Sequence, residues 1–432
     1  MPSNCIDIAT LRVNGERYLP TRINRISFFI VSVQASRIVL DNLKPMSQMD
    51  TQMPQMANPT PLPRSKIATP KTARKSEAVH QRNGSLMKQI RNGLSMLAFA
   101  ICATAMPAHA QDKLRLTIAN GIAPTIPTHW WFTDFIGPKL EQQSKGRIQP
   151  NVQVNATLCS EHKCVEQARL GQIDIGSVSG GNIGSFGQTF DILNLPYIFK
   201  DDASAEKLIN GWLGKELSVR AEKEMGLHII AIIPSYSFRN VGNSKREVRV
   251  PEDLKGLKIR VTKSPVELNL MKTWGATAVP FDWAQLYEGL STGIVDGYYI
   301  PDAYVAAQKF YEVAKHITNT GGAWNAHIIF MDKKRYDRLP DWAKQTINQI
   351  GDEIRAQSFK VDAEWMAKQN KILEGKVKVY QPTAQELERW YGGAPGAWAT
   401  VKGTYDAALA RRALQEQGQS ELIKKLEAVK AL

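Results

Sequence analysis

The chain has 432 residues, more than a single hydrophobic core usually contains, so its length predicts at least two lobes. Hydrophobic residues make up 43% and charged residues 22%, which argues against a mostly disordered chain or a polytopic membrane protein. The formal net charge of +14 would favour a nucleic acid or anionic lipid partner, but residues 1–110 carry +9 of it, with 14 Lys and Arg against 5 Asp and Glu. The remaining 322 residues carry only +5, so no nucleic-acid partner is expected.

Residues 87–110 contain the three regions of a secretory signal peptide. Lys88 and Arg91 precede an apolar stretch over 94–106, and the sequence AHA over 108–110 supplies the small residues of a cleavage site. We therefore expect cleavage after residue 110 and a periplasmic mature protein. The apolar stretch has about 13 residues, fewer than the roughly 20 that span a bilayer as a helix, so no stable membrane anchor is expected.

Residues 1–86 precede this signal. Between 45 and 85 they are rich in Pro, Ser, Lys and Met, a composition that cannot bury a core. They are interpreted as a disordered, mis-assigned upstream extension, with Met87 as the true start of the protein. The competing interpretation, a basic tail that binds nucleic acid, has neither interleaved aromatic residues nor a motif.

Two of the four cysteines, Cys159 and Cys164, lie in the predicted mature chain, which export would place in an oxidising compartment. Their Cys-x4-Cys spacing favours a disulfide that closes a six-residue loop. Free thiols and a zinc site are the alternatives, but zinc would need two further ligands and His162 is the only nearby candidate.

From residue 114 onward, short apolar runs alternate with amphipathic segments. The pattern predicts strands over 114–119, 148–154, 173–178, 227–233, 257–261 and 295–299, and helices over 131–144, 164–170, 203–225, 265–274 and 283–292. Such alternation is typical of an α/β fold with mainly parallel sheets. Beyond about residue 339, the segments 342–371 and 384–430 have apolar residues three and four apart and predict a helical C-terminal part.

Enzyme signatures are absent from the predicted mature chain. Its histidines form no His-Glu-x-x-His pair, and no Gly-x-Ser-x-Gly elbow is present. The glycine-rich stretch GSVSGGNIGSFG over 176–187 matches neither the dinucleotide-binding nor the phosphate-loop pattern. No cofactor and no metal are therefore expected, and this stretch is interpreted as a loop where the backbone approaches a ligand.

The segment 251–307 contains PEDLKGLKIRV and WGATAVPFDWAQLYEGLSTGIVDGYYIP, and it resembles the solute-binding receptors of tripartite ATP-independent periplasmic (TRAP) transporters. The resemblance covers about residues 112–430 and includes QARLGQIDIG, LPYIF and QKFYEVAKHIT in one order. It implies a two-lobed α/β periplasmic binding protein of the Venus-flytrap type, with hinge strands that cross twice and a long bracing helix. Lobe I is expected over 111–235 and about 325–375, lobe II over 236–324, and C-terminal helices over 376–432.

The resemblance also implies a function, which is capture of an organic acid by its carboxylate in an interlobe cleft and delivery to TRAP membrane permease subunits. Two alternatives stay open: an extracytoplasmic sensor subunit that uses the same cleft, and a secreted enzyme, for which no nucleophile or base is visible. Whether the protein is a monomer or a dimer is also open.

Within that family the arginine of the GLKIRV motif grips the ligand carboxylate, and here it is Arg260. A guanidinium suits this role because it offers a planar pair of donors and is weakly hydrated. Arg239 matches a second arginine near the ligand, with an interlobe salt bridge as its alternative role. Trp283 matches an aromatic residue of the pocket, and Asn120 a polar position near the ligand. Other aromatic residues expected to flank the cleft, with the core as their alternative, are Trp131, Tyr298, Tyr299 and Trp324.

The sequence departs from the family pattern at one position of interest. Many members read VDGQENP where this chain reads VDGYYIP over 295–301, so Ile300 replaces the asparagine that usually donates to the substrate. This loss of an amide donor, together with the aromatic faces expected at the cleft, favours a less hydroxylated ligand, an aromatic or branched monocarboxylate, over sugar acids and simple dicarboxylates.

Overall fold

The computed structural model describes residues 12–13, 16–17 and 113–432. The predicted signal peptide and nearly all of the predicted upstream extension lie outside the described residues. In the N-terminal part, β1 (Arg12–Val13) and β2 (Glu16–Arg17) form an antiparallel pair. Within the described ranges, no helix has the length and apolar character needed to cross a membrane.

The first large sheet has five strands in the order β4-β3-β5-β12-β6. Its strands are β3 (Leu114–Ala119), β4 (Ile148–Gln153), β5 (Ile175–Ser179), β6 (Leu227–Phe238) and β12 (Trp324–Asp332). β12 is buried along nearly its whole length because both faces are covered: Ile328 and Phe330 pack into one core, Ile329 and Met331 into another.

The second large sheet has six strands in the order β13-β11-β7-β10-β8-β9. They are β7 (Asn240–Asn243), β8 (Lys258–Val261), β9 (Thr277–Pro280), β10 (Gly297–Ile300), β11 (His316–Thr318) and β13 (Lys378–Tyr380). Both large sheets are mixed, which corrects the prediction of mainly parallel sheets. In each sheet the strand that arrives from the other sheet, β7 or β12, runs antiparallel to both of its neighbours.

Two extended segments cross between the two sheets, and the long helix that follows β12 leads back to the second sheet. β6 continues through Arg239 into β7, and β11 returns through residues 319–323 to β12. Close to the crossing, Phe238 pairs with Trp324 and Pro234 with Ala326, so three residues of β6 stand opposite one residue of β12. This bulge holds Tyr236 and Ser237 at φ values of 70° and 68°, in the left-handed region that side chains rarely adopt.

Helices cover both sheets. Those of the first lobe are α3 (Pro127–Trp130), η1 (Trp131–Ile136), α4 (Gly137–Gln143), η2 (Glu161–Lys163), α5 (Cys164–Arg169), α6 (Gly180–Ile183), η3 (Asp191–Asn194), α7 (Asp202–Ile209), α8 (Trp212–Arg220), η4 (Ala221–Met225) and α12 (Lys333–Asp337). Those of the second are η5 (Pro251–Leu254), α9 (Pro265–Thr273), η6 (Trp283–Gln285), α10 (Leu286–Ser291), α11 (Asp302–Ala307) and η7 (Phe310–Glu312). The predicted helix over 203–225 is divided because the chain turns at Gly211, where a Cβ atom would lie 2.5 Å from the Lys207 carbonyl oxygen.

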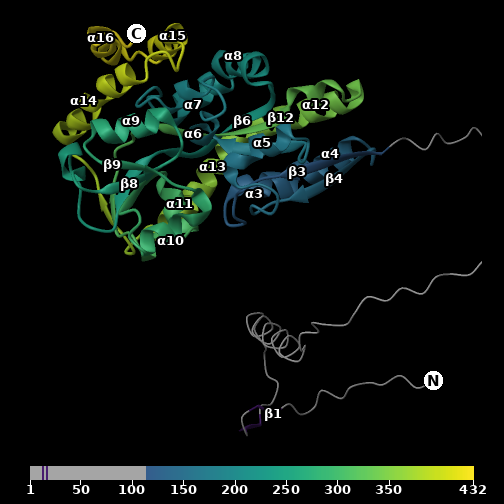
Figure 1. Cartoon of the computed structure of the whole chain (residues 1–432), viewed down its shortest axis with the longest axis horizontal. Helices are drawn as coiled ribbons and strands as arrows, with labels where there is room; N and C mark the ends of the chain where they lie inside the picture. The colour runs from purple at the N-terminus through teal and green to yellow at the C-terminus, as the bar shows by residue number, and fades with distance from the viewer. Residues whose placement is uncertain (1–11, 14–15, 18–112) are drawn as a thin grey trace, which may run out of the picture. The chain divides into compact units, whose positions relative to one another are not determined.

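The long helix α13 (Asp341–Leu373) packs against β6 in the first lobe and reaches α11 of the second, which confirms the bracing helix. The C-terminal helices α14 (Ala384–Thr400), α15 (Ala407–Glu416) and α16 (Ser420–Ala428) lie together at one edge of the part formed by residues 113–432 (Figure 1). α14 packs on α9, while the Trp398 indole donates to the Pro196 carbonyl oxygen of the first lobe at 2.9 Å. The predicted helical segment over 376–432 also contains β13, which joins the second sheet.

Candidate ligand-binding site

A small cavity lies between the two lobes, beside the crossing segments, and we call it the ligand cavity. Its volume is about 20 Å³, roughly the space one water molecule needs. The first lobe lines it with Ile122, Glu161, Ser179, Asn325 and His327, and the second with Arg260, Thr262, Trp283, Ile300 and Tyr304, while Arg239 comes from the first crossing.

Arg260 reaches the cavity because of the alternation of strand β8. Ile259 and Val261 pack into the core, so the residue between them points to the opposite face. Its Nε donates to the Phe281 carbonyl oxygen at 3.0 Å and its guanidinium lies 5.7 Å from the Trp283 ring. Its two terminal nitrogens make no hydrogen bond within the described part of the chain. Burial lowers the pKa of this guanidinium, but an arginine remains charged at any working pH.

Arg239 is bound largely by the protein itself. Its terminal nitrogens donate to the Tyr299 carbonyl oxygen at 3.1 Å and to Asn325 Oδ1 at 2.6 Å, and one of them lies 3.2 Å from Glu267 Oε1. Asn325 belongs to the first sheet, whereas Tyr299 and Glu267 belong to the second lobe. Arg239 therefore has the geometry of an interlobe tie and keeps less donor capacity for a ligand than Arg260.

A carboxylate and an imidazole face each other across the cavity wall. Glu161 Oε1 accepts from the Ser179 backbone N–H at 2.8 Å and lies 3.7 Å from His327 Nε2. Burial disfavours the ionised form of Glu161, but His327, Ser179 and Arg260 outweigh it and lower the pKa of the carboxyl. Burial lowers the pKa of His327, only partly offset by Glu161, so the imidazole is neutral near pH 7.

His327 also belongs to a chain of hydrogen bonds. Its Nδ1 lies 3.1 Å from Ser235 Oγ, which lies 2.7 Å from the Tyr304 hydroxyl. Tyr304 belongs to the second lobe and Ser235 to the bulge of β6. The chain leaves His327 Nε2 without a hydrogen bond from any described residue, at the cavity surface.

The predicted disulfide between Cys159 and Cys164 is confirmed. It closes the loop that contains η2, and this loop carries Glu161 to the cavity. Gly121 packs against the loop so closely that a Cβ atom there would lie 2.4 Å from the Glu161 backbone nitrogen. The cysteine pair and Gly121 therefore position a cavity residue rather than an exposed turn.

Of the predicted site residues, the structure brings Arg260, Arg239 and Trp283 together on the cavity, with Ile300 beside them. It places the other aromatic residues in cores, which was their alternative role. Trp131 packs on Phe135, Tyr299 on Trp274, Tyr298 against Phe310, and Trp324 on Phe199. Their large apolar rings are buried there without a face on the ligand cavity.

Asn120 lies behind the cavity wall. Its side chain accepts from the Ile122 backbone N–H at 3.1 Å and donates to the Thr128 carbonyl oxygen at 3.4 Å. It thereby shapes the loop after β3 that brings Ile122 to the cavity. Its position supports a structural contribution to the site and no direct place on the cavity surface.

Three residues that line the cavity were not predicted from the sequence: Glu161, Asn325 and His327. Asn325 and His327 lie within an apolar strand, where the pattern does not reveal which face is open to a cavity. Glu161 had one signal, its place inside the Cys-x4-Cys loop. Across residues 113–432, no cluster of three His, Cys, Asp or Glu side chains has the geometry of a metal site.

Comparison with known proteins places these features in a wider group. The family model of bacterial extracellular solute-binding proteins, family 7, matches residues 127–402. A solute-binding protein of Verminephrobacter eiseniae is 32% identical over 239 residues, which are 54% of this chain and 68% of the relative. The 2,3-diketo-L-gulonate-binding periplasmic protein YiaO of Escherichia coli is 29% identical over 250 residues, 58% of this chain and 75% of its own length.

The fold is also similar to solved structures. A TRAP periplasmic solute-binding protein from Shewanella oneidensis, solved with bound succinate, matches with a TM-score of 0.66 and 19% identity. The match covers 70% of this chain and 99% of that one. At this level of identity the likeness shows the fold, and it confirms the predicted two-lobed periplasmic binding architecture.

Proposed function

The chain belongs to the bacterial extracellular solute-binding proteins of family 7, and on this premise we propose that it holds an organic carboxylate on Arg260 and delivers it to a TRAP-type membrane permease. The observation that carries the proposal is the state of the Arg260 guanidinium. It is buried at the ligand cavity, yet its two terminal nitrogens have no hydrogen-bond acceptor among the described residues. A carboxylate presents two oxygens with the spacing that this planar pair of donors requires.

The charges around the ligand cavity favour a ligand with a single carboxylate. Two arginines, Arg239 and Arg260, and two glutamates, Glu161 and Glu267, cancel formally, while His327 is neutral. A first carboxylate can bind the free nitrogens of Arg260. A second would lie close to the glutamates without a cation of its own, and burying an unpaired charge is costly.

The polar groups of the cavity favour a hydroxylated acid. Glu161 is an acceptor and His327 Nε2 is free to bond, so each can serve a ligand hydroxyl. The expectation of an aromatic or branched acid depended on Ile300 in place of an asparagine and on aromatic residues at the cleft. Ile300 and Trp283 line the cavity, but the four other aromatic residues lie in the cores. We therefore propose a monocarboxylic sugar acid, the class to which the ligand named for the Escherichia coli relative belongs.

Ligand entry requires the lobes to move apart. The cavity in this structure holds about one water molecule, far less than a sugar acid, so the arrangement corresponds to a closed cleft. Rotation about the two crossing segments would open it, and a ligand that contacts both lobes would then favour closure.

A thermal-shift screen of organic acids tests the proposal, because a ligand at 100 times its dissociation constant adds about 2.7 kcal/mol to the folded state. The screen should contain monocarboxylic sugar acids, succinate, and aromatic and branched monocarboxylates. We expect the largest shift with a sugar acid, together with a smaller radius of gyration by X-ray scattering when it binds. A shift with neutral sugars, and with none of these carboxylates, would refute the proposal.

Delivery to a permease needs its own test. Vesicles that contain the two TRAP membrane subunits should take up the acid only when this protein is present. The reported relatives are solute-binding proteins, and no observation favours the sensor or the secreted enzyme. We also propose that the protein acts in the periplasm after cleavage following residue 110, which N-terminal sequencing of exported protein would check.

A further inference from the structure

A second cavity, of about 600 Å³, lies behind the crossing segments, and we call it the hinge pocket. Phe238 and Asn240 line it, whereas Arg239 between them lines the ligand cavity. Neighbouring residues of an extended segment point to opposite sides, so the two cavities lie on opposite faces of the crossing. The volume of the hinge pocket is within the range of small-molecule sites.

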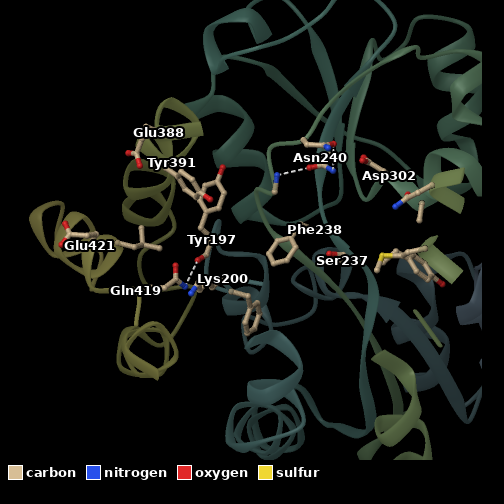
Figure 2. Close-up of a pocket in the computed structure, with 18 of the residues that line it drawn as sticks. Tyr197, Lys200, Ser237, Phe238, Asn240, Asp302, Glu388, Tyr391, Gln419 and Glu421 are labelled. Atoms are coloured by element: carbon tan, nitrogen blue, oxygen red, sulfur yellow. Dashed lines mark hydrogen bonds between the residues drawn. The ribbon is translucent and has the colours of Figure 1, made fainter. Parts of the chain in front are cut away.

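Four parts of the fold meet at the hinge pocket. Tyr197 comes from the first lobe, Asp302 from α11 of the second, Met366 from the long helix α13, and Tyr391 from α14. Figure 2 shows Tyr197 and Tyr391 on one side, Asp302 on the other, and Phe238 between them. A molecule bound in the hinge pocket would therefore contact both lobes, the long helix α13 and the C-terminal helix α14.

Asp302 is half-buried and is the least exposed of the charged residues that line this pocket. Its Oδ1 is buried and accepts no hydrogen bond from any residue the structure describes, and Asp302 forms no salt bridge with a described cation. Burial raises the pKa of this carboxyl to about 6, with Asn240 offsetting part of the effect. It is thus largely ionised at neutral pH, although a half-buried carboxylate without a cationic partner is unfavourable.

The aromatic side chains of the pocket are suited to an apolar body or a cation. The rings of Tyr197 and Tyr391 lie 4.1 Å apart between centroids, and Phe238 lies between them and Asp302. Aromatic faces attract ammonium groups through their negative π surface. An amine with an apolar substituent would have a partner for each end.

The carboxylates at the mouth of the pocket are paired with lysines. Glu388 and Glu421 carry two negative charges, and Lys200 and Lys425 carry two positive ones. Lys425 is already 3.3 Å from Glu388. Glu421 is likewise 2.9 Å from Lys424, so both carboxylates at the mouth are paired, whereas Asp302 forms no salt bridge with a cation among the described residues.

We propose that the hinge pocket is a second binding site, for a small organic amine whose ammonium group pairs with Asp302 and whose apolar part lies against Phe238 and the two tyrosines. The site is distinct from the carboxylate site and does not depend on it. Because the hinge pocket is wide while the ligand cavity is narrow, an amine bound there favours the closed cleft. The carboxylate and the amine should then strengthen each other's binding by the same factor.

Calorimetric titration of the whole protein with phenethylamine tests this site, with 2-phenylethanol as a neutral probe of similar shape. We expect phenethylamine to bind and 2-phenylethanol to bind at least tenfold more weakly. Asp302→Asn should weaken phenethylamine at least tenfold, whereas Asp341→Asn, at an exposed carboxylate on α13, should leave it unchanged. Equal affinity for the two probes, no binding of phenethylamine, or full affinity in Asp302→Asn would each overturn the proposal.

Two measurements separate this site from the proposed carboxylate function. Phenethylamine should bind Arg260→Ala as well as it binds the wild type, so a failure of carboxylate binding would leave the amine site intact. Near-ultraviolet circular dichroism of Asp302→Asn should match the wild type and show that the variant is folded. The coupling rests on the proposed function, and a carboxylate affinity that does not change with saturating phenethylamine would overturn it.

Discussion

The ligand cavity and the hinge pocket lie on opposite faces of the same crossing segments, but their charged side chains differ in how they are paired. On the ligand side, Arg239 lies beside Glu267 and the Glu161 carboxylate accepts a backbone N–H, within a space of about 20 Å³. On the hinge side, a buried oxygen of Asp302 has no partner among the described residues, within about 600 Å³. On the ligand side, paired charges hold Arg239 and Glu161 in place and leave the terminal nitrogens of Arg260 for a ligand, whereas the hinge side is wider and leaves a carboxylate oxygen without a partner. Rotation of the lobes about the crossing segments would widen one of the two cavities and narrow the other.

The largest expected effect is on the ligand side, at Arg260. Arg260→Ala should weaken carboxylate binding by on the order of 2 to 5 kcal/mol, because the bound carboxylate would be left buried and unpaired. This corresponds to a roughly 30-fold to several-thousand-fold loss in calorimetric titration. Arg260→Lys should recover part of it, since the ammonium keeps the charge but loses the two-point geometry.

The matched control for that loss is Arg389→Ala, at an exposed arginine of α14 that pairs with Glu252. It should bind the acid as the wild type does. Full affinity in Arg260→Ala would show that the carboxylate binds elsewhere, and the contrast between the two cavities would then lose its basis.

The next effect is on the hinge side and depends on pH. The pKa of Asp302 is about 6 in the folded protein against 3.8 as its ordinary value, so the folded state keeps the proton longer. Its contribution to stability is fully present below about pH 4 and is lost as pH rises through 6, by roughly 2 to 3 kcal/mol. Urea unfolding between pH 4 and pH 8 should show this decline in the wild type and not in Asp302→Asn.

Asp362 and Asp202 are carboxylates near β6 that both proteins retain. The difference between the two pH curves of the unfolding free energy therefore reports on Asp302 alone. Saturating phenethylamine should reduce the difference at pH 7, because an ammonium partner favours the ionised carboxylate. Parallel pH curves for the two proteins would mean that Asp302 is not a strained charge.

The third effect concerns the loop that carries Glu161. Replacing both Cys159 and Cys164 by Ser should lower the unfolding free energy by about 2 kcal/mol, the value expected for opening so short a loop. Carboxylate affinity should fall as well, because Glu161 loses its fixed position. Ser160→Ala, which keeps the bond, is the control; unchanged stability and affinity in the double variant would show that the loop is held without the bond.

The smallest effect is at Trp283, whose ring lies 5.7 Å from the Arg260 guanidinium. Trp283→Leu should cost about 0.5 to 1 kcal/mol of carboxylate affinity, a two- to fivefold change, because the cation–π contact is lost while an apolar side chain is kept. Trp130→Leu, at a residue that does not line the ligand cavity, should change nothing measurable. A loss as large as that of Arg260→Ala would mean that Trp283 contacts the ligand more extensively.

Much of the fold was predictable from local patterns. The strand over 114–119 coincides with β3 and the helix over 342–371 lies within α13, because burial of one face leaves a clear period in the sequence. The central strand β12 was missed, since an apolar run buried on both faces has no alternation to recognise. The three-residue strand β13 was missed because its pairing with β11 is a long-range contact.

The candidate site was predictable only where a motif named a residue. Arg260 and Trp283 reach the cavity, and both came from the family motif. Tyr298 and Tyr299 are neighbours of Ile300, yet they are buried in two different cores, because successive residues of a strand face opposite ways. No sequence motif lies next to His327. It reaches the cavity only because β12 packs between β5 and β6.

The bulge of β6 affects the rate at which the cleft opens and closes. Tyr236 and Ser237 keep φ values near +70°, which costs on the order of 1 kcal/mol or more for each residue with a side chain. A change in these two φ angles can accommodate a rotation of one lobe while the strand pairs on either side of the bulge keep their hydrogen bonds. The backbone strain at the bulge then changes as the cleft opens. Ser237→Gly would remove the backbone strain at this position. It would change how fast the cleft opens and releases its solute, even where the equilibrium affinity stays the same.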